Sequence, residues 1–175
     1  MGWFLGARLG LLAAGALMGA RETEVQGESV EAAWAHLRAL EGTWRGHSSK
    51  GWDETLTLQL IAGGSVLLET SRFDDDPKGE NAMATAYYKD GNRLLLTHYC
   101  EARNQPRLMA SSVEGEGSTL LFTFLDATNL PSRDTGHMDS VLMRLLDHDH
   151  FQSRWTWYES GKERWLEEIR YERAH

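Results

Sequence analysis

From residue 43 onward, the sequence is a series of short runs rich in Leu, Val, Thr, Tyr, Phe and Trp, and turn-forming residues separate each run from the next. Apolar and polar residues alternate within several runs; Leu56, Leu58 and Leu60, for example, are separated by polar residues. Such alternation is typical of half-buried β-strands, and many short strands in succession are typical of an all-β fold. We predict ten strands, at residues 43–48, 54–61, 65–73, 82–88, 93–100, 106–113, 118–125, 137–146, 150–158 and 164–173.

The connections between these strands differ at the two ends of the predicted sheet. If each strand runs antiparallel to the one before it, one end carries only the tight segments 62–64, 90–92, 114–117 and 147–149, most of which contain hairpin-forming glycine. The connections at the other end are at least as long, and two of them, 74–81 and 126–136, are much longer. A sheet of this size either closes or leaves hydrogen-bonding edges exposed. We therefore predict an antiparallel meander closed into a barrel, with a base of tight turns and a rim of long loops; two packed sheets are the alternative.

A single helix is predicted before the first strand. Val30, Trp34 and Leu37 recur at helical spacing, Ser29 can cap the start of the helix, and Gly42 ends it. Because the first strand starts at the base, we expect the helix to cover that end of the barrel. A barrel of eight or more strands can hold a small ligand inside, so the rim is the expected entrance.

The N-terminal segment has the pattern of a targeting sequence. Arg8 is the only charged residue of residues 1–20, and residues 9–20 form an apolar run. This run is shorter than the about 20 residues that a membrane-spanning helix needs, but it suits a secretory signal peptide. We predict a signal peptide at residues 1–20, a linker at 21–28, and a single barrel domain at 29–175 that is secreted or periplasmic, with no stable membrane insertion of the mature chain. An uncleaved N-terminal anchor is the alternative.

Charge and cysteine content exclude several classes of function. The chain has 18 Lys and Arg against 26 Asp and Glu, with no basic cluster, and phosphate binding relies on clustered cations, so we predict no nucleic-acid partner. One cysteine excludes an intramolecular disulfide framework and a Cys-only zinc site. No GxSxG, P-loop, HExxH or dinucleotide-binding motif occurs. We predict no cofactor, and the oligomeric state stays open.

The segment Gly42-Thr43-Trp44, which follows the predicted helix and opens the first strand, resembles the Gly-x-Trp signature of lipocalins. Ten strands and the longer sequence Gly-Thr-Trp-Arg-Gly are more similar to the nitrobindin and fatty-acid-binding branches of the same calycin group. This resemblance implies that Trp44 packs across the closed end and that a late arginine, Arg170 or Arg173, stacks on it. Nitrobindins carry haem on a histidine of the last strand, where this chain has none, so haem is not carried over from the resemblance. Residues 98–106 are similar to a family of uncharacterised secreted bacterial barrel proteins.

Several chemically capable residues belong to the rim end of the predicted barrel. They come from strands five, six, eight and nine and from the loop between strands five and six: His98, Cys100, Asn104, Gln105, Arg107, His137, Asp139, Trp155 and Trp157. Trp52 lies in the first rim loop. Alternation gives His98 the same face as Cys100, and His137 the same face as Asp139, but it does not decide which faces point inward.

Three interpretations of this rim set remain open. The residues are hydrogen-bonded or outward-facing polar groups, or they bind the polar end of a small molecule between aromatic walls, or His98, Cys100, His137 and Asp139 bind a transition metal. Other acidic pairs, such as Glu167-Glu168, are interpreted as strand surface. The leading hypothesis is a secreted barrel that binds a small apolar or amphipathic molecule. The alternatives are an enzyme or metal-binding protein that uses a His98/His137 site at the barrel mouth, or an interaction module that acts through its rim loops.

Overall fold

The structure, a computed structural model, describes the backbone of residues 27–175 and the side chains of residues 29–164 and 167–175. The predicted signal peptide, at residues 1–20, and the linker up to residue 26 lie outside this range. The described elements are α1 (Gly27–Ala39), β1 (Gly42–Ser48), β2 (Asp53–Ile61), η1 (Ala62–Gly64), β3 (Val66–Phe73), β4 (Met83–Asp90), β5 (Arg93–Tyr99), β6 (Gln105–Glu114), η2 (Gly115–Gly117), β7 (Thr119–Thr128), β8 (His137–Leu145), β9 (His150–Glu159) and β10 (Lys162–Arg173).

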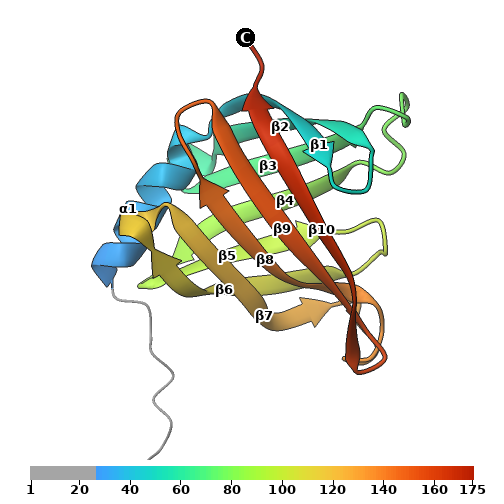
Figure 1. The fold of residues 1–175 in the computed structure, drawn as a ribbon. Coiled ribbons are helices and arrows are strands. Elements are labelled where there is room, and N and C mark those ends of the chain that lie inside the picture. The colour runs from blue at the N-terminus through green and yellow to red at the C-terminus, as the bar shows by residue number, and fades with distance from the viewer. Residues whose placement is uncertain (1–26) are drawn as a thin grey trace, which may run out of the picture.

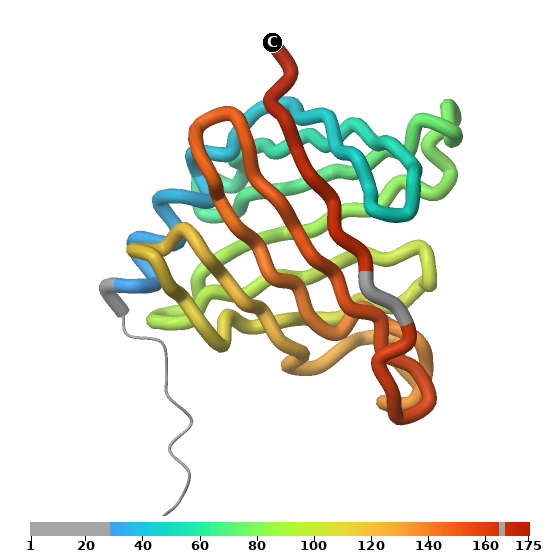
Figure 2. Tube along the Cα trace, in the orientation of Figure 1, coloured from blue at the N-terminus to red at the C-terminus, as the bar shows by residue number. Residues whose placement is uncertain are grey.

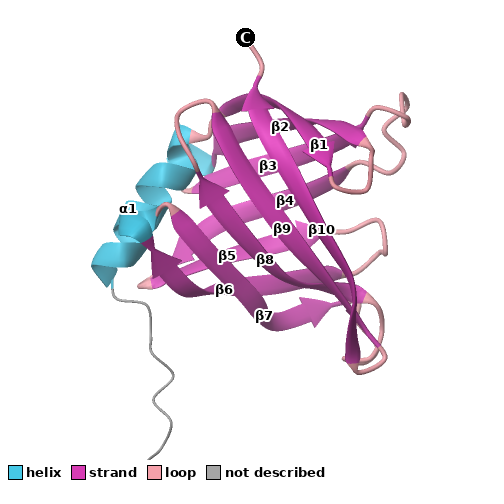
Figure 3. Cartoon of the chain, viewed as in Figure 1, coloured by secondary structure: helices cyan, strands magenta, loops and turns pink. Residues whose placement is uncertain are grey.

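The ten strands form one closed antiparallel barrel, which confirms the predicted fold (Figures 1 and 3). Each strand pairs with its neighbour in sequence, and β1 also pairs with β10 in the register that places Trp44 opposite Arg173. The strands lie within a few residues of the predicted ranges. Because the last strand returns to the first, all ten strands have two hydrogen-bonded neighbours, so the sheet has no open edge.

Helix α1 covers the base, as predicted. Figure 1 shows it at the end of the barrel where the tight turns lie, and Figure 2 shows the β1–β2, β3–β4 and β5–β6 connections at the opposite side. Glu31 of α1 is paired with Lys89 at the end of β4 with an N···O distance of 2.6 Å. The helix begins at Gly27, so Ser29 lies inside its first turn and the prediction that Ser29 caps it is wrong.

Trp44 and Arg173 close the base in the way that the resemblance implies. Trp44 is buried, its Nε1 donates a hydrogen bond to the Leu40 carbonyl (2.8 Å), and the Arg173 guanidinium lies 4.1 Å from the centre of its ring. Arg173 also donates to the carbonyls of Ala39 (3.1 Å) and Glu41 (2.9 Å) at the end of α1. Gly42 has a φ of +141°, and a Cβ there would lie 2.7 Å from Arg173 Nη1, so only glycine fits.

The inward-facing side chains change character along the barrel. Towards the base they are apolar and fully buried, as with Leu58, Leu67 and Leu96. Further along the same strands, towards the rim, the inward positions carry Glu69 and His98, which are buried as well. The apolar side chains fill the half of the barrel beside α1, and the polar side chains surround a cavity in the half beside the rim. Within residues 27–175, no helix has the length and apolar content needed to cross a bilayer.

Candidate functional site

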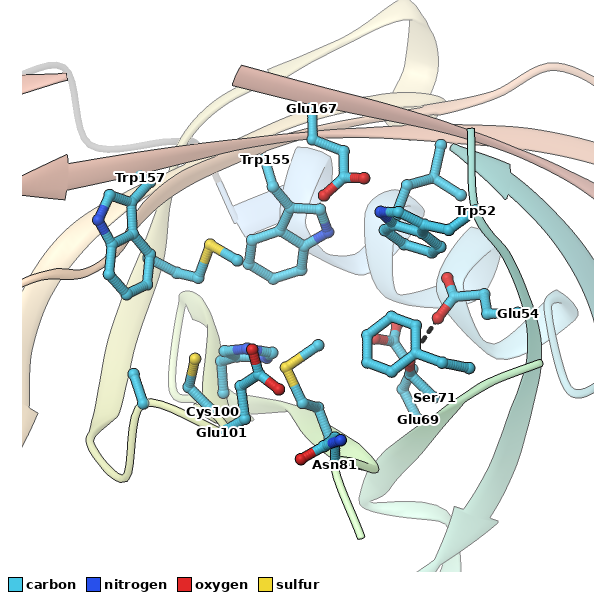
Figure 4. Close-up of a pocket in the computed structure, with 16 residues that line it drawn as sticks. Trp52, Glu54, Glu69, Ser71, Asn81, Cys100, Glu101, Trp155, Trp157 and Glu167 are labelled. Atoms are coloured by element: carbon cyan, nitrogen blue, oxygen red, sulfur yellow. Dashed lines mark hydrogen bonds between the residues drawn. The ribbon is translucent and has the colours of Figure 1, made fainter. Parts of the chain in front are cut away.

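A cavity of about 440 Å³ lies inside the rim half of the barrel (Figure 4). Three rim connections contribute to it, because Trp52 belongs to the β1–β2 connection, Asn81 to the β3–β4 connection, and Ala102 to the β5–β6 connection. Asn81 and Ala102 are exposed, so the mouth opens between these two loops. The residues that line the cavity are Trp52, Glu54, Glu69, Ser71, Phe73, Asn81, Met83, His98, Cys100, Glu101, Ala102, Met138, Trp155, Trp157, Glu167 and Ile169.

One part of the lining consists of aromatic rings and the methionine side chains Met83 and Met138. Trp52 meets Phe73 edge to face, with ring centres 5.0 Å apart, and Trp155 and Trp157 reach the cavity from β9. Figure 4 shows Trp155 and Trp52 on either side of the Glu167 carboxyl group. Aromatic walls of this kind are typical of sites that bind small molecules.

Three buried glutamates form the polar part of the lining. Glu54 of β2, Glu69 of β3 and Glu167 of β10, here called the carboxyl cluster, are each at most 9% exposed. Their strand positions explain their burial: Glu54 has the same parity as the buried Leu56, and Glu69 the same parity as the buried Leu67. Strand alternation therefore directs all three carboxyl groups into the barrel.

Glu54 is held by two hydroxyl donors. The Tyr171 hydroxyl donates to one carboxyl oxygen (2.7 Å), and the Ser71 hydroxyl donates to the other. Burial raises the pKa of Glu54, and these two hydrogen bonds oppose the rise without cancelling it. Glu54 is thus a fixed carboxyl group that holds its proton more tightly than an exposed one.

Glu69 and Glu167 have the same arrangement with fewer donors. The Tyr87 hydroxyl donates to Glu69 (2.8 Å), and burial raises the pKa of Glu69 to about 7, with a further contribution from the nearby charge of Glu54. The Ser48 hydroxyl donates to Glu167, and burial raises the pKa of Glu167, again with a contribution from Glu54. The members of the carboxyl cluster therefore repel one another when ionised.

His98 lies beside the carboxyl cluster as a neutral ring. Its ring centre is 5.0 Å from that of Trp155, and its Nδ1 is 3.0 Å from the Thr85 hydroxyl oxygen. Burial lowers the pKa of His98 to about 4, so the imidazole is neutral at pH 7. When Nδ1 donates to the Thr85 hydroxyl, Nε2 of this neutral ring carries the lone pair and is an acceptor.

The Nε2 atom of His98 is buried, and no side chain described, at residues 29–164 and 167–175, gives it a hydrogen bond. Most buried polar atoms in proteins have a partner. Cys100, on the same face of the chain two residues later, is also buried, and burial raises the pKa of its thiol. Its sulfur is therefore protonated at pH 7 and takes part in the lining as a weakly polar group.

The structure brings together four of the nine predicted site residues, namely His98, Cys100, Trp155 and Trp157, which all line the cavity. The side chains of His98 and Cys100 point into the barrel. This shows which face of residues 93–100 is the inner one, a point that alternation left open. The remaining five lie elsewhere: Asn104, Gln105, Arg107, His137 and Asp139.

Asn104, Gln105 and Arg107 do not line the cavity, and each forms a hydrogen bond elsewhere in the barrel. The Asn104 amide donates to the Gly136 carbonyl (2.9 Å) and joins two rim loops. Gln105 accepts from the Thr128 hydroxyl (2.8 Å). Arg107 is partly exposed, and its Nε donates to Asp126 (2.6 Å) on the neighbouring strand. These side chains tie the rim together and do not reach a ligand in the cavity.

His137 and Asp139 lie away from the cavity because β8 has a bulge. The register of β8 against β9 shifts between Met138 and Ser140. As a result, the side chains of Met138, before the bulge, and Val141, after it, both point into the barrel, and Met138 lines the cavity. The prediction that His137 and Asp139 belong to the ligand-binding residues is therefore corrected, since a bulge adds one residue and breaks the period of two.

His137 belongs to a separate packed cluster at the β7–β8 connection. Its ring lies 5.0 Å from Phe124 and 5.7 Å from Tyr158, and the Arg133 guanidinium lies over both of those rings. His137 donates from Nδ1 to the Thr135 carbonyl (2.6 Å), and Arg133 donates to Nε2 and to Asp139. All polar atoms of this ring are occupied, which indicates a structural role.

The arrangement does not support the predicted alternative of a metal or catalytic site shared by His98 and His137. These two histidines belong to different clusters, and in the part of the chain that the structure describes, no three His, Cys, Asp or Glu side chains are placed to hold a metal ion.

The carboxyl cluster was not anticipated from the sequence. The prediction that Glu167 and Glu168 both belong to an acidic surface is wrong for Glu167, which is buried in the cavity wall, and holds only for its neighbour, which pairs with Arg170. Strand alternation contains the signal, because Glu54 and Glu167 alternate in step with the buried apolar residues of their strands. Glutamate is charged and lies on the surface in most proteins, so the residue type alone predicts the opposite orientation.

The sequence matches no protein-family profile and no curated protein. Among solved structures, Rv2717c from M. tuberculosis has a TM-score of 0.55 at 14% identity, with 82% of this chain and 98% of that chain covered. A protein of unknown function from the DUF3598 family of Nostoc punctiforme has a TM-score of 0.49 at 19% identity over 79% of this chain, and this chain spans about half, 49%, of that protein. At these identities the likeness to Rv2717c concerns the fold alone.

Proposed function

We propose that this protein binds a small amphipathic molecule in the cavity at the rim of the barrel. The observation that carries the proposal is the composition of the lining, in which an aromatic wall faces buried polar groups across about 440 Å³. Binding sites for small molecules have this volume and this character, mostly apolar with a few fixed polar groups. The apolar part of the ligand packs against Trp52, Trp155 and Trp157, and its polar end meets the carboxyl cluster and His98.

The proposal includes a calycin-like architecture and a location outside the cytoplasm. The support for the first is the contact of Arg173 with Trp44 after Gly42, which matches the lipocalin-like signature. The support for the second is the apolar segment at residues 9–20. N-terminal sequencing of the protein recovered from its native cells tests the location, because a secreted form lacks residues 1–20.

Fluorescence of the neutral apolar dye N-phenyl-1-naphthylamine tests the binding function. We expect the emission of the dye to rise when it enters the cavity of the wild-type protein. An Ala102→Phe variant fills the mouth and removes most of the rise, because Ala102 is exposed and lines the cavity. An Ala174→Phe variant places the same ring on an exposed position beside the base and retains the rise. No rise in the wild type, or an equal rise in Ala102→Phe, contradicts the proposal.

A further inference from the structure

Building on the proposed binding function, we infer that the ligand carries a positively charged amine, which the carboxyl cluster and His98 bind in the interior of the barrel. The charge balance of the cavity, the unpartnered Nε2 atom of His98 and the aromatic walls all support this class of ligand.

The cavity holds buried acids without a matching base. None of the described residues that line it is lysine or arginine, whereas Glu54, Glu69 and Glu167 all contribute carboxyl groups. Buried charges in proteins are nearly always paired, because an unpaired one is poorly solvated. Lys50, whose charge acts on Glu167, lies in the exposed part of the β1–β2 connection and does not line the cavity. A cationic ligand supplies the counter-charge that the described lining lacks.

His98 provides a second feature that points to a ligand, which is a buried ring nitrogen without a partner among the described residues. Its side chain is 96% buried, since 4% is exposed, and lines the cavity, and Nε2 has no partner among residues 29–164 and 167–175. In the tautomer with the proton on Nδ1, the neutral ring offers a lone pair at Nε2, and a ligand with N–H donors favours that tautomer. A primary ammonium group has three N–H donors, so it can donate to the Nε2 of His98 and to carboxylate oxygens at the same time.

The aromatic walls favour an organic cation over a metal ion. Trp52 and Trp155 stand on either side of the Glu167 carboxyl group (Figure 4), and indole faces attract alkylammonium groups. A divalent metal needs several closely spaced ligands, and the described side chains contain no such group of three. The carbon skeleton of an organic amine also uses the apolar surface of Met83 and Met138, which a metal ion does not.

The charge outside the cavity acts in the same direction. Glu101 lies exposed at the mouth, and the whole chain carries a formal net charge of −8. A negative entrance raises the local concentration of cations and lowers that of anions. Anionic ligands such as carboxylates are therefore disfavoured both at the mouth and inside.

Three probes with the same skeleton test this inference: 3-phenylpropan-1-amine, 3-phenylpropan-1-ol and 3-phenylpropanoate. Their dissociation constants are measured at pH 7 by the change in tryptophan fluorescence, to which Trp52, Trp155 and Trp157 respond from the cavity wall. We expect the amine to bind about tenfold or more tightly than the alcohol, as charge-assisted hydrogen bonds are stronger than neutral ones, and the carboxylate to bind most weakly.

Variants locate the origin of the preference. Glu167→Gln keeps the shape of the side chain and is expected to reduce the amine-to-alcohol ratio by about tenfold, as is Glu54→Gln. Glu168→Gln is the matched control on the same strand, because Glu168 points away from the cavity and contacts Arg170. It leaves the ratio unchanged.

The outcomes separate this inference from the proposed function. If the alcohol or the carboxylate binds as tightly as the amine, the inference is overturned and the proposed binding function stands. If the amine is preferred but both cavity variants keep the wild-type ratio, the inference is overturned as well, because the preference then arises elsewhere. If none of the three probes changes the fluorescence at millimolar concentration while the neutral dye still binds, the inference fails alone; if the dye also fails to bind, both fail. The wild-type comparison remains decisive even if a variant does not fold.

Discussion

Replacement of Glu69 by glutamine is expected to stabilise the protein in a pH-dependent way. Glu69 is buried beside Tyr87 in the wall of the cavity, and burial raises its pKa from 4.5 to about 7. Glutamine has the same shape and keeps a carbonyl oxygen as an acceptor for the Tyr87 hydroxyl, but it has no charge to bury.

The size and the sign of the effect follow from proton linkage. One pKa unit corresponds to about 1.4 kcal/mol, so the shift of Glu69 corresponds to about 3 kcal/mol. A carboxyl group whose pKa is higher in the folded than in the unfolded protein destabilises the fold once it is ionised. The contribution is nearly absent at pH 4, where both states are protonated, grows as the pH rises from 4.5 to about 7, and is complete above that range.

Urea denaturation of the wild type and of Glu69→Gln at pH 4 and pH 8 measures this contribution. The free energy of unfolding of the variant, relative to that of the wild type, is expected to increase by about 3 kcal/mol between the two pH values. A constant offset from the change of side chain cancels in this comparison. Glu159→Gln, which alters an exposed carboxyl group on β9, is the control and gives no such increase. An equal pH dependence in Glu69→Gln and wild type refutes the reasoning.

Two further predictions concern His98 and the base of the barrel. Burial lowers the pKa of His98 from 6.5 to about 4, so the wild-type protein loses free energy of unfolding as the pH falls through that range and protonation of the ring is disfavoured in the fold. His98→Gln has no ring to protonate. Its free energy of unfolding relative to wild type is therefore expected to increase by up to about 3 kcal/mol between pH 7 and pH 4. Urea titrations at the two pH values measure this increase, with His36→Gln, which alters an exposed histidine of α1, as the control. If the difference in free energy of unfolding between His98→Gln and wild type is the same at pH 7 and pH 4, the prediction is wrong. Arg173→Met, which loses the contact with Trp44 and the hydrogen bonds to the carbonyls of Ala39, Glu41 and His148, is expected to lower the free energy of unfolding by about 2 kcal/mol. Arg170→Met, at an exposed position, has little effect, and similar losses in both variants would show that the contacts of Arg173 add no stability.

The architecture could be predicted from the sequence because strand alternation and turn residues are local signals. Hairpin turns such as the one around Gly91 join strands that are adjacent in sequence, so the meander needs no long-range information. The closing contact of Arg173 with Trp44 joins opposite ends of the domain, and it was anticipated only through the resemblance of residues 42–44 to a known signature.

The site could be predicted only in part, for two physical reasons. Alternation placed His98 and Cys100 on one face, and the structure shows that this face points inward. The bulge after Met138 turned His137 away, and a bulge of this kind leaves no local mark in the sequence. Buried Glu54 contradicts the general preference of glutamate for water, and only its partners Ser71 and Tyr171, which come from other strands, make the burial tolerable.

The pairing of β1 with β10 has a consequence for how the molecule comes into being. A polypeptide that leaves the ribosome with its N-terminus first has β1 available long before β10 exists, so the ring cannot be completed co-translationally before the tenth strand emerges. Until then the nascent chain presents two unpaired edges, and such edges invite pairing with other polypeptides. Contacts between segments so distant along the chain also form slowly. A folding chaperone that shields the early strands is therefore expected to raise the yield of this barrel more than it accelerates the final closure.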